Sequence, residues 1–195
     1  MNKIKNNQEN QIIVLLGASA SGKDSLASNF KKLGWGFVTS HTTRPIRENE
    51  SQGNPYHFID KETMQGFIDN NELIEYRTYD TILNGESQKW YYAVHNNEIK
   101  PNEKYIVVLD LEGFKEFKHK FGSRVVGYYL EVPNVVRTER AMGRGSFCES
   151  EWERRLVADS NDFHWLKLKE ANVEVIPFKW QTVEELYLEI TEGAK

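Results

Sequence analysis

The chain has 195 residues and a formal net charge of −4; 39% of its residues are hydrophobic and 28% are charged. These proportions suit one compact α/β domain with a sizeable core, and the acidic balance argues against a binder of nucleic acid polymers, which usually carries a basic face. No apolar run approaches the roughly 20 residues of a membrane-spanning helix, and the single cysteine, Cys148, excludes an intrachain disulfide. We therefore expect a cytoplasmic protein without a membrane partner, and the charge is compatible with a pocket for a small anionic ligand.

The first half of the chain predicts strands and helices in alternation. Residues 1–10 are rich in Asn and Lys and predict a flexible leader rather than a signal peptide. Residues 12–16 (IIVLL) are typical of a strand buried on both faces, and from Lys23 the apolar residues take helical spacing until Gly34. A second strand is predicted at residues 37–40 and a short strand at residues 73–76. Asp60 is predicted to cap a helix.

The second half continues this alternation, with strands predicted at residues 105–110 (YIVVLD), 125–130 and 173–176. The helix between the first two carries a stripe that we interpret as core packing: Phe114, Phe117 and Phe121. Two capping boxes predict the starts of later helices: Ser150 with Glu153, and Thr182 with Glu185. This order predicts a parallel sheet with helices on both faces, in which ligands bind beyond the carboxyl ends of the strands.

A glycine-rich loop follows the first strand. Residues 17–25 (GASASGKDS) match the pattern G-x-x-x-x-G-K between a buried strand and an amphipathic helix, the context in which that pattern binds phosphate. The glycines let backbone N–H groups point at phosphate oxygens, and the helix N-terminus and the lysine add positive potential. The residues expected to hold nucleotide phosphates are Gly17, Ala18, Ser19, Ala20, Ser21, Gly22, Lys23, Asp24 and Ser25.

Asp24 departs from this pattern, which normally offers a Ser or Thr hydroxyl to Mg²⁺ at that position. A carboxylate is a good ligand for Mg²⁺, directly or through water, but it adds negative charge beside the phosphates. Asp24 therefore predicts either an altered metal ligand or weakened nucleotide binding, and the intact Lys23 and both glycines favour the first interpretation.

A second polar stretch follows the strand predicted at residues 37–40. It places Arg44 and Arg47 three residues apart among hydroxyl groups, which suits a phosphate monoester because guanidinium groups pair with its oxygens. On these residues alone, a solvated charged loop explains the pattern equally well.

The stretch SHTTRPIRENESQGNPYHF resembles the acceptor signature of guanylate kinases. The resemblance continues through NNELIEY, WYY and VVLDLEG to MGRGSFCESEWERRL, and so covers residues 12–163. It implies a P-loop fold in one domain over residues 11–195, with an acceptor-binding region at residues 38–98 and a helical lid at residues 134–160. It also implies phosphoryl transfer from ATP, with Mg²⁺, to a small-molecule nucleotide, above all GMP or dGMP.

The resemblance assigns roles to the residues at matching positions. Residues implied in acceptor binding are Ser40, Arg44, Arg47, Tyr56, Glu75, Tyr92, Asp110 and Glu112. Glu75 would read the guanine edge, since a carboxylate accepts hydrogen bonds from the ring N–H and the exocyclic amine together. For Glu112, a surface acid with no role in the site is nearly as good an interpretation.

The same resemblance implies the residues that carry the transfer. Those implied in catalysis are Lys23, Arg44 and the lid arginines Arg140, Arg144 and Arg155. Mg²⁺ would lie near Asp24 and Asp110. Two further arginines, Arg137 and Arg154, match the family less well, and we expect them to be exposed helix charges.

The chain departs from the family in two places that bear on the acceptor. After Tyr92 the family usually has Gly and then Ser or Thr, whose hydroxyl helps to bind the guanine oxygen, whereas this chain has Ala93 and Val94. Residues 78–89 also resemble an insertion. Loss of one hydrogen bond costs about 1 kcal/mol, enough to relax selectivity without abolishing binding.

Three alternatives stay open at this point. A modified deoxynucleotide is one possible acceptor. The G-K-D-S form of the loop is similar to that of the related ribose-bisphosphate kinases, which lack the full Arg44, Arg47 and Tyr56 signature. A protein-binding module that has lost catalysis is the third, although Lys23 and the lid arginines argue against it. The sequence leaves the oligomeric state open, a homodimer included.

Overall fold

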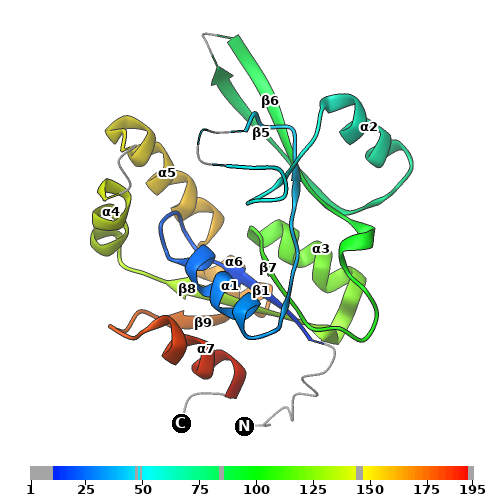
Figure 1. Ribbon diagram of the computed structural model, residues 1–195. Helices are drawn as coiled ribbons and strands as arrows, with labels where there is room; N and C mark the ends of the chain where they lie inside the picture. Colours follow the sequence, from blue (N-terminus) through cyan, green and yellow to red (C-terminus); the bar gives the residue numbers. More distant parts are fainter. Residues whose placement is uncertain (1–10, 47, 49, 84–85, 144–146, 193–195) are drawn as a thin grey trace.

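The computed structural model describes residues 11–46, 48, 50–83, 86–143 and 147–192, which form two sheets and their covering helices (Figure 1). The first sheet is wholly parallel, and its strands in spatial order are β2 (Gly36–Phe37), β7 (Tyr105–Val108), β1 (Ile12–Leu16), β8 (Val125–Glu131) and β9 (Glu174–Pro177). The second sheet has the order β4 (His57–Phe58), β3 (His41–Thr42), β6 (Glu86–His95) and β5 (Leu73–Leu83).

Helices cover both faces of the parallel sheet, as the alternation predicts. On one face, Ile13 and Leu15 of β1 pack with residues of α1 (Lys23–Lys32) and α7 (Val183–Glu192), including Phe30. On the other face, Ile12, Val14 and Leu16 pack with α3 (Leu111–Phe121) and α6 (Trp165–Glu170). Every residue of β1 is fully buried, because each face of the strand meets a helical layer and each edge meets another strand.

Several local predictions are confirmed. The Phe114 and Phe117 rings are buried in the core. Asp60 caps α2 (Lys61–Asp69), with its Oδ1 accepting a hydrogen bond from the Thr63 N–H at 2.7 Å. The capping box before α7 forms, because the Thr182 N–H donates to Glu185 and the Glu185 N–H donates to the Thr182 hydroxyl.

Other local predictions are wrong, each for a tertiary reason. Ser150 and Glu153 do not cap a helix, because α5 (Glu149–Asp162) begins earlier, with Cys148 at its N-cap position. Of the strand predicted at residues 37–40, only Phe37 lies in a strand, since the chain leaves the first sheet after Phe37 and joins the second at His41. The strand predicted at residues 73–76 continues to Leu83, because its extension pairs with β6 in an antiparallel hairpin.

The lid predicted at residues 134–160 contains α4 (Asn134–Met142) and α5, which lie together on one side of the molecule (Figure 1). Trp152 of α5 is buried, and its indole N–H donates to the Thr138 hydroxyl of α4 at 3.0 Å. None of the helices in the described ranges has the length and apolar character needed to span a membrane.

Gly127 of β8 allows the close approach of α3 to the sheet. A Cβ at this position would lie 2.6 Å from Cε2 of Phe114, whose ring is buried and has no room to move. Gly127→Ala should therefore lower the free energy of unfolding by about 1–3 kcal/mol, the usual cost of overpacking. Urea denaturation measures this.

The matched control is Gly66→Ala in α2, where an added Cβ meets nothing within 4 Å. It should be neutral or stabilising by up to about 1 kcal/mol. Equal effects of the two substitutions would contradict the packing explanation.

Candidate active site

The glycine-rich loop, the acceptor stretch and the lid meet at one cavity of about 1020 Å³. The loop supplies Gly17, Ser19 and Lys23, and α5 supplies Arg155 among others. The wall on the second sheet and the loop before it is formed by Ser40, Tyr56, Glu75, Arg77, Tyr79, Asp80, Trp90 and Tyr92. The carboxyl end of β7 closes the cavity with Val108, Leu109 and Asp110.

The loop between β1 and α1 has the curled backbone that phosphate binding needs. Lys23 lies over it, with its ammonium donating to the carbonyl oxygens of Gly17 at 2.6 Å and Ala18 at 3.1 Å. Gly22 has φ 98°, a conformation that favours glycine. Ala20 has φ 61°, so a residue with a Cβ holds a left-handed conformation at a cost of about 1–2 kcal/mol. The sequence pattern did not reveal this strain.

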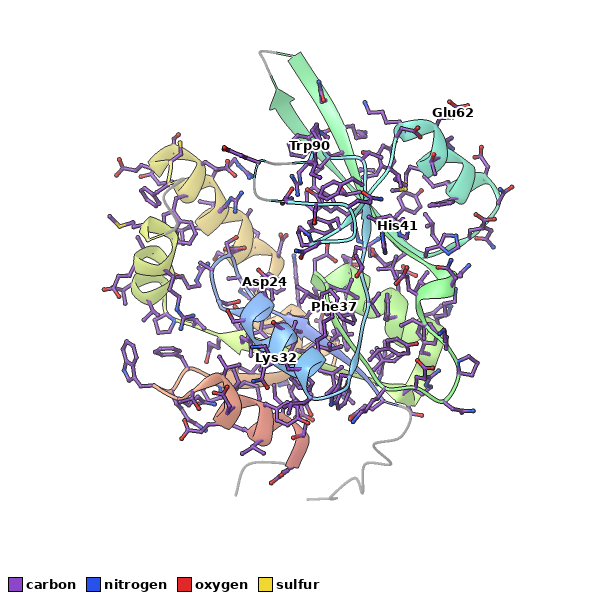
Figure 2. All side chains as sticks on the ribbon, in the orientation of Figure 1. Asp24, Lys32, Phe37, His41, Glu62 and Trp90 are labelled. Atoms are coloured by element: carbon purple, nitrogen blue, oxygen red, sulfur yellow. The ribbon has the colours of Figure 1, made fainter. Side chains whose placement is uncertain are left out.

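The two carboxylates expected near Mg²⁺ have different surroundings. Asp24 is exposed in the first turn of α1, at the end of the helix that faces the second sheet (Figure 2). Asp110 caps α3 by accepting from the Gly113 N–H at 2.7 Å and also accepts from the Tyr79 hydroxyl at 3.2 Å. Mg²⁺ is usually held by one or two carboxylates together with phosphates and water, so Asp24 fits that ion without a cage of protein ligands.

Two tyrosines predicted to bind the acceptor face each other in the cavity wall. The rings of Tyr56 and Tyr92 contact edge to face, with centroids 5.5 Å apart. Burial, and then the nearby Tyr92 and Asp24, raise the pKa of the Tyr56 hydroxyl, which is therefore a neutral donor at pH 7. Ser40 lies in the same wall.

Arg44 is buried behind this wall. Its Nη2 donates to both carboxylate oxygens of Glu50, at 2.8 and 2.9 Å, and its guanidinium lies 5.6 Å from the Tyr56 ring centroid. The side chain is thus already paired, which sequence analysis did not anticipate. Arg47 lies outside the described residues, as does the lid residue Arg144.

Glu75 is buried in the cavity wall, and no lysine or arginine of the described residues is in tight contact with it. Its nearest cationic partner is Arg77, with 3.8 Å between Nη1 and a Glu75 carboxylate oxygen. Burial therefore raises the Glu75 pKa to about 7, and Arg77 opposes this shift. Asp110 lies 3.7 Å from the Nε of the same arginine, so one guanidinium stands between two carboxylates.

Arg77, Tyr79 and Trp90 belong to the cavity wall but were absent from the sequence prediction. Tyr79 contacts Tyr92 edge to face at 5.5 Å, and Figure 2 shows Trp90 at the base of the long hairpin. All three lie at or next to the ends of residues 78–89, which resemble an insertion, and the aromatic side chains Tyr79 and Trp90 were the available sequence signal.

The lid arginines within the described ranges reach the loop or the cavity. Arg140 donates to the carbonyl oxygen of Ser21 at 3.0 Å, and Arg155 lines the cavity while its Nε donates to Glu151 at 2.8 Å. Arg154 is exposed, as expected, and pairs with Glu151 as well, but it also lines the cavity, which the sequence did not predict. Glu112 does not line the cavity and pairs with Lys115 on the surface, in agreement with its alternative interpretation as a surface acid.

Arg137 is not an exposed helix charge, and this prediction is wrong. It is 4% exposed and donates to the Asp159 carboxylate at 2.8 Å and to the Ser19 carbonyl oxygen at 2.9 Å. Asp159 in turn accepts from the Ser19 N–H at 2.9 Å. The pair joins α4 and α5 to the glycine-rich loop, a contact between residues too far apart in sequence for any local pattern to show.

A second cavity, of about 440 Å³, lies on the other side of the loop. Ala20, Ser21 and Gly22 form one wall of this cavity. The opposite part lies between the carboxyl edge of the sheet and the start of α7. Its apolar walls include Leu130, Val132, Ile176 and Phe178, and Arg140 lies 5.8 Å from the Phe178 ring centroid.

A family model described as guanylate kinase matches residues 9–165. The chain belongs to the guanylate kinase family. The guanylate kinase of Schizosaccharomyces pombe is 32% identical over 150 residues, which cover 74% of this chain and 71% of the relative. That of Sus scrofa is 29% identical over 154 residues, which cover 77% and 75%.

Solved structures agree on the fold. A crystal structure of guanylate kinase from Anaplasma phagocytophilum has a TM-score of 0.59 at 20% identity and covers 95% of this chain and 84% of its own. A gluconokinase from Sinorhizobium meliloti has a TM-score of 0.52 at 14% identity and covers 96% and 93%. Membership of the guanylate kinase family makes this protein a nucleotide-binding transferase, a nucleoside monophosphate kinase.

One departure from the guanylate kinase pattern lies in the core next to the cavity wall. Val94 is the cross-strand partner of Glu75 and is fully buried. The residue beside the buried carboxylate is therefore apolar, at the position where the sequence comparison expected a hydroxyl.

The ion pair of Arg137 and Asp159 should contribute to stability, since its side chains are 5% and 14% exposed. Asp159→Ala leaves a buried guanidinium unpaired and should lower the free energy of unfolding by about 3–5 kcal/mol. Arg154→Ala, at a pair with side chains 66% and 42% exposed, is the control and should cost no more than about 1 kcal/mol. Chemical denaturation of both variants measures the difference, and a loss below 1 kcal/mol for Asp159→Ala contradicts the assignment.

Proposed function

We propose that this protein transfers the γ-phosphoryl group of ATP to a guanine nucleoside monophosphate, GMP or dGMP, with Mg²⁺ as cofactor. The observation that carries the proposal is the shared cavity, in which Gly17 and Lys23 of the phosphate loop lie opposite Tyr56, Glu75 and Tyr92. Phosphoryl transfer needs little covalent chemistry, and it depends on holding donor and acceptor in line within one water-excluding space.

The donor nucleotide has a matching pair of sites. Its phosphates would lie on the loop, where backbone N–H groups and Lys23 point at their oxygens. Its base would enter the smaller cavity, whose apolar walls suit a flat aromatic ring and which opens directly onto Ser21 and Gly22. Arg140 would lie between base and phosphates, beside Phe178.

Glu75 is the group that selects guanine. Its ionised carboxylate accepts from the guanine ring N–H and amine together, and adenine cannot supply that pair of donors. Arg77 favours the ionised form of the carboxylate, although burial has the larger effect on its pKa. The acceptor phosphate would be bound by Ser40, Tyr56 and Tyr92, with Arg47 also assigned by the family pattern.

Whether Arg44 binds the acceptor phosphate directly depends on its pairing with Glu50. It reaches a phosphate directly only if Glu50 gives up one of its two hydrogen bonds. Without that exchange, its positive charge still lies behind Tyr56 and favours an anion in front of the ring.

Positive charge around the transferring group comes from Lys23, Arg140 and Arg155, together with Arg144 from the family pattern. When bound, Mg²⁺ would neutralise charge on the donor phosphates, with Asp24 and Asp110 as the carboxylates assigned to it. The lid helices would exclude water and so limit hydrolysis of the donor.

A modified guanine nucleotide is a second candidate acceptor. The aromatic wall of Tyr79 and Trp90 at the base of the extended hairpin favours it. These rings enlarge the apolar surface offered to a base substituent, whereas a ribose bisphosphate has no group for Glu75 or these rings to bind.

A coupled assay of ADP release tests the proposal. With GMP, dGMP, AMP, CMP and ribose 1,5-bisphosphate as acceptors, kcat/KM should be highest for a guanine nucleotide. Lys23→Ala should lower kcat at least about 100-fold, the effect of removing one preorganised charge from a transition state. A higher kcat/KM for ribose 1,5-bisphosphate or AMP than for every guanine nucleotide would contradict the proposal.

Glu75→Gln tests base selection. The amide cannot accept two hydrogen bonds from guanine, so kcat/KM for GMP should fall about 10- to 100-fold, the effect of losing a hydrogen bond to a charged group. In the parent, kcat/KM for GMP should decrease as the pH falls through about 7, because protonation removes the acceptor. The exposed Glu62→Gln in α2 should change neither quantity.

Ionisation of Glu75 should have opposite effects on activity and on stability: it raises kcat/KM but lowers the free energy of unfolding. The folded protein raises the Glu75 pKa from its ordinary 4.5 to about 7, so this group's contribution is present at pH 4 and is lost as the pH rises through 7. Glu75→Gln should therefore be more stable than the parent at pH 8, by about 1–3 kcal/mol, and the difference should shrink at pH 5. Urea denaturation at both pH values measures it, and a variant less stable than the parent at pH 8 would contradict the effect.

A further inference from the structure

Three histidines gather on the side of the second sheet that faces α2, where His41 and His95 contact Phe67; Figure 2 labels His41. His41 of β3 and His57 of β4 are register partners, with ring centroids 4.8 Å apart. His95 of β6 lies 5.8 Å from His41. The proposed phosphoryl transfer uses none of these side chains, so their clustering calls for another explanation.

Two of these rings and one carboxylate converge. The ligand atoms of His41, His57 and Glu98 all lie within 4.8 Å of one another, and His57 Nε2 is 3.7 Å from the Glu98 carboxylate. His41 Nδ1 is buried and has no hydrogen-bond partner among the residues that the structure describes. A buried ring nitrogen without a partner is unfavourable unless something binds it.

His95 has a different environment, which separates it from this set. Its Nδ1 accepts from the Asn97 N–H at 3.2 Å, and its Nε2 faces the Glu72 carboxylate at 3.5 Å. Both ring nitrogens of His95 are thus occupied, and its ring packs against Phe67 at 4.7 Å.

We propose that His41, His57 and Glu98 bind a divalent transition metal ion, with Zn²⁺ as the best match. Two imidazoles and a carboxylate are a ligand set that Zn²⁺ accepts in tetrahedral geometry, leaving one position for water.

The ligands must approach each other to bind the ion. Metal–ligand bonds of 2.0–2.1 Å in a tetrahedral site put ligand atoms about 3.4 Å apart, compared with the upper bound of 4.8 Å here. The side chains of His57 and Glu98 are 35% and 21% exposed, so they have room to rotate by the remaining distance.

The ion would connect three elements: β3, β4 and the short helix η2 (Asn96–Glu98). The segment between the two histidines carries Arg44 and Tyr56, and the ion would hold its two ends together. The ion would thus stabilise the conformation of the acceptor-binding region from a site separate from the proposed reaction cavity.

Isothermal titration of the full-length protein with ZnCl₂, without an affinity tag and without nucleotide, tests the proposal. We expect one Zn²⁺ per chain, a rise in the thermal unfolding midpoint, and no comparable effect of MgCl₂, which prefers oxygen ligands. With Co²⁺ in place of Zn²⁺, visible absorption should show tetrahedral coordination.

The variants His57→Gln and Glu98→Gln should each weaken Zn²⁺ binding at least about tenfold, since even the partners of metal ligands contribute that much. His119→Gln, at an exposed position on α3, is the matched control and should bind as the parent does. Cys148→Ser removes the only thiol of the chain and should also leave binding unchanged.

Several outcomes would overturn the proposal. They are the absence of Zn²⁺ binding, unchanged binding in both ligand variants, and loss of binding in Cys148→Ser or His119→Gln. If His57→Gln fails to fold, Glu98→Gln alone decides, because its side chain lies at the surface of a short helix. The titration contains no nucleotide, so its result is independent of the proposed kinase substrate.

Discussion

Burial of β1 on both faces and pairing on both edges is the constraint on which the site depends. A strand in that position cannot shift along its neighbours without moving Ile13 and Leu15 out of one core layer and Ile12 and Val14 out of the other. The chain therefore leaves the sheet at a fixed point, and the glycine-rich loop begins there. The pair of Arg137 and Asp159 then joins the lid helices to the same loop, so the rigid strand also positions α4 and α5.

Charge in the cavity is arranged around a buried carboxylate. Glu75 is desolvated, and a single guanidinium from Arg77 lies between it and Asp110. Such a carboxylate is unfavourable for folding at neutral pH, but it is well placed to accept two hydrogen bonds from a base. Arg44 shows the reverse arrangement, a buried cation whose carboxylate partner Glu50 is close and bidentate. The buried charge of Glu75 thus lowers stability, whereas that of Arg44 is compensated by its partner.

The extended hairpin changes which side chains the second sheet contributes to the cavity wall. Residues that resemble an insertion pair with each other in register, so that the hairpin is a continuous part of β5 and β6. Its base supplies Tyr79 and Trp90 to the cavity wall, while Val94 replaces a polar neighbour of Glu75. The same sheet holds the histidine cluster that we propose as a metal site, close to the acceptor wall.

The sequence by itself determined the buried strand at residues 12–16, the position of the glycine-rich loop after it and the aromatic stripe of α3, because each depends on residues that are neighbours along the chain. Only the tertiary structure decided that Arg137 is buried, that Arg44 is paired with Glu50, and that Val94 lies opposite Glu75. It alone also placed Arg77 and Trp90 in the cavity. These outcomes depend on burial and on partners far away in sequence, and no local spacing of residue types carries that information.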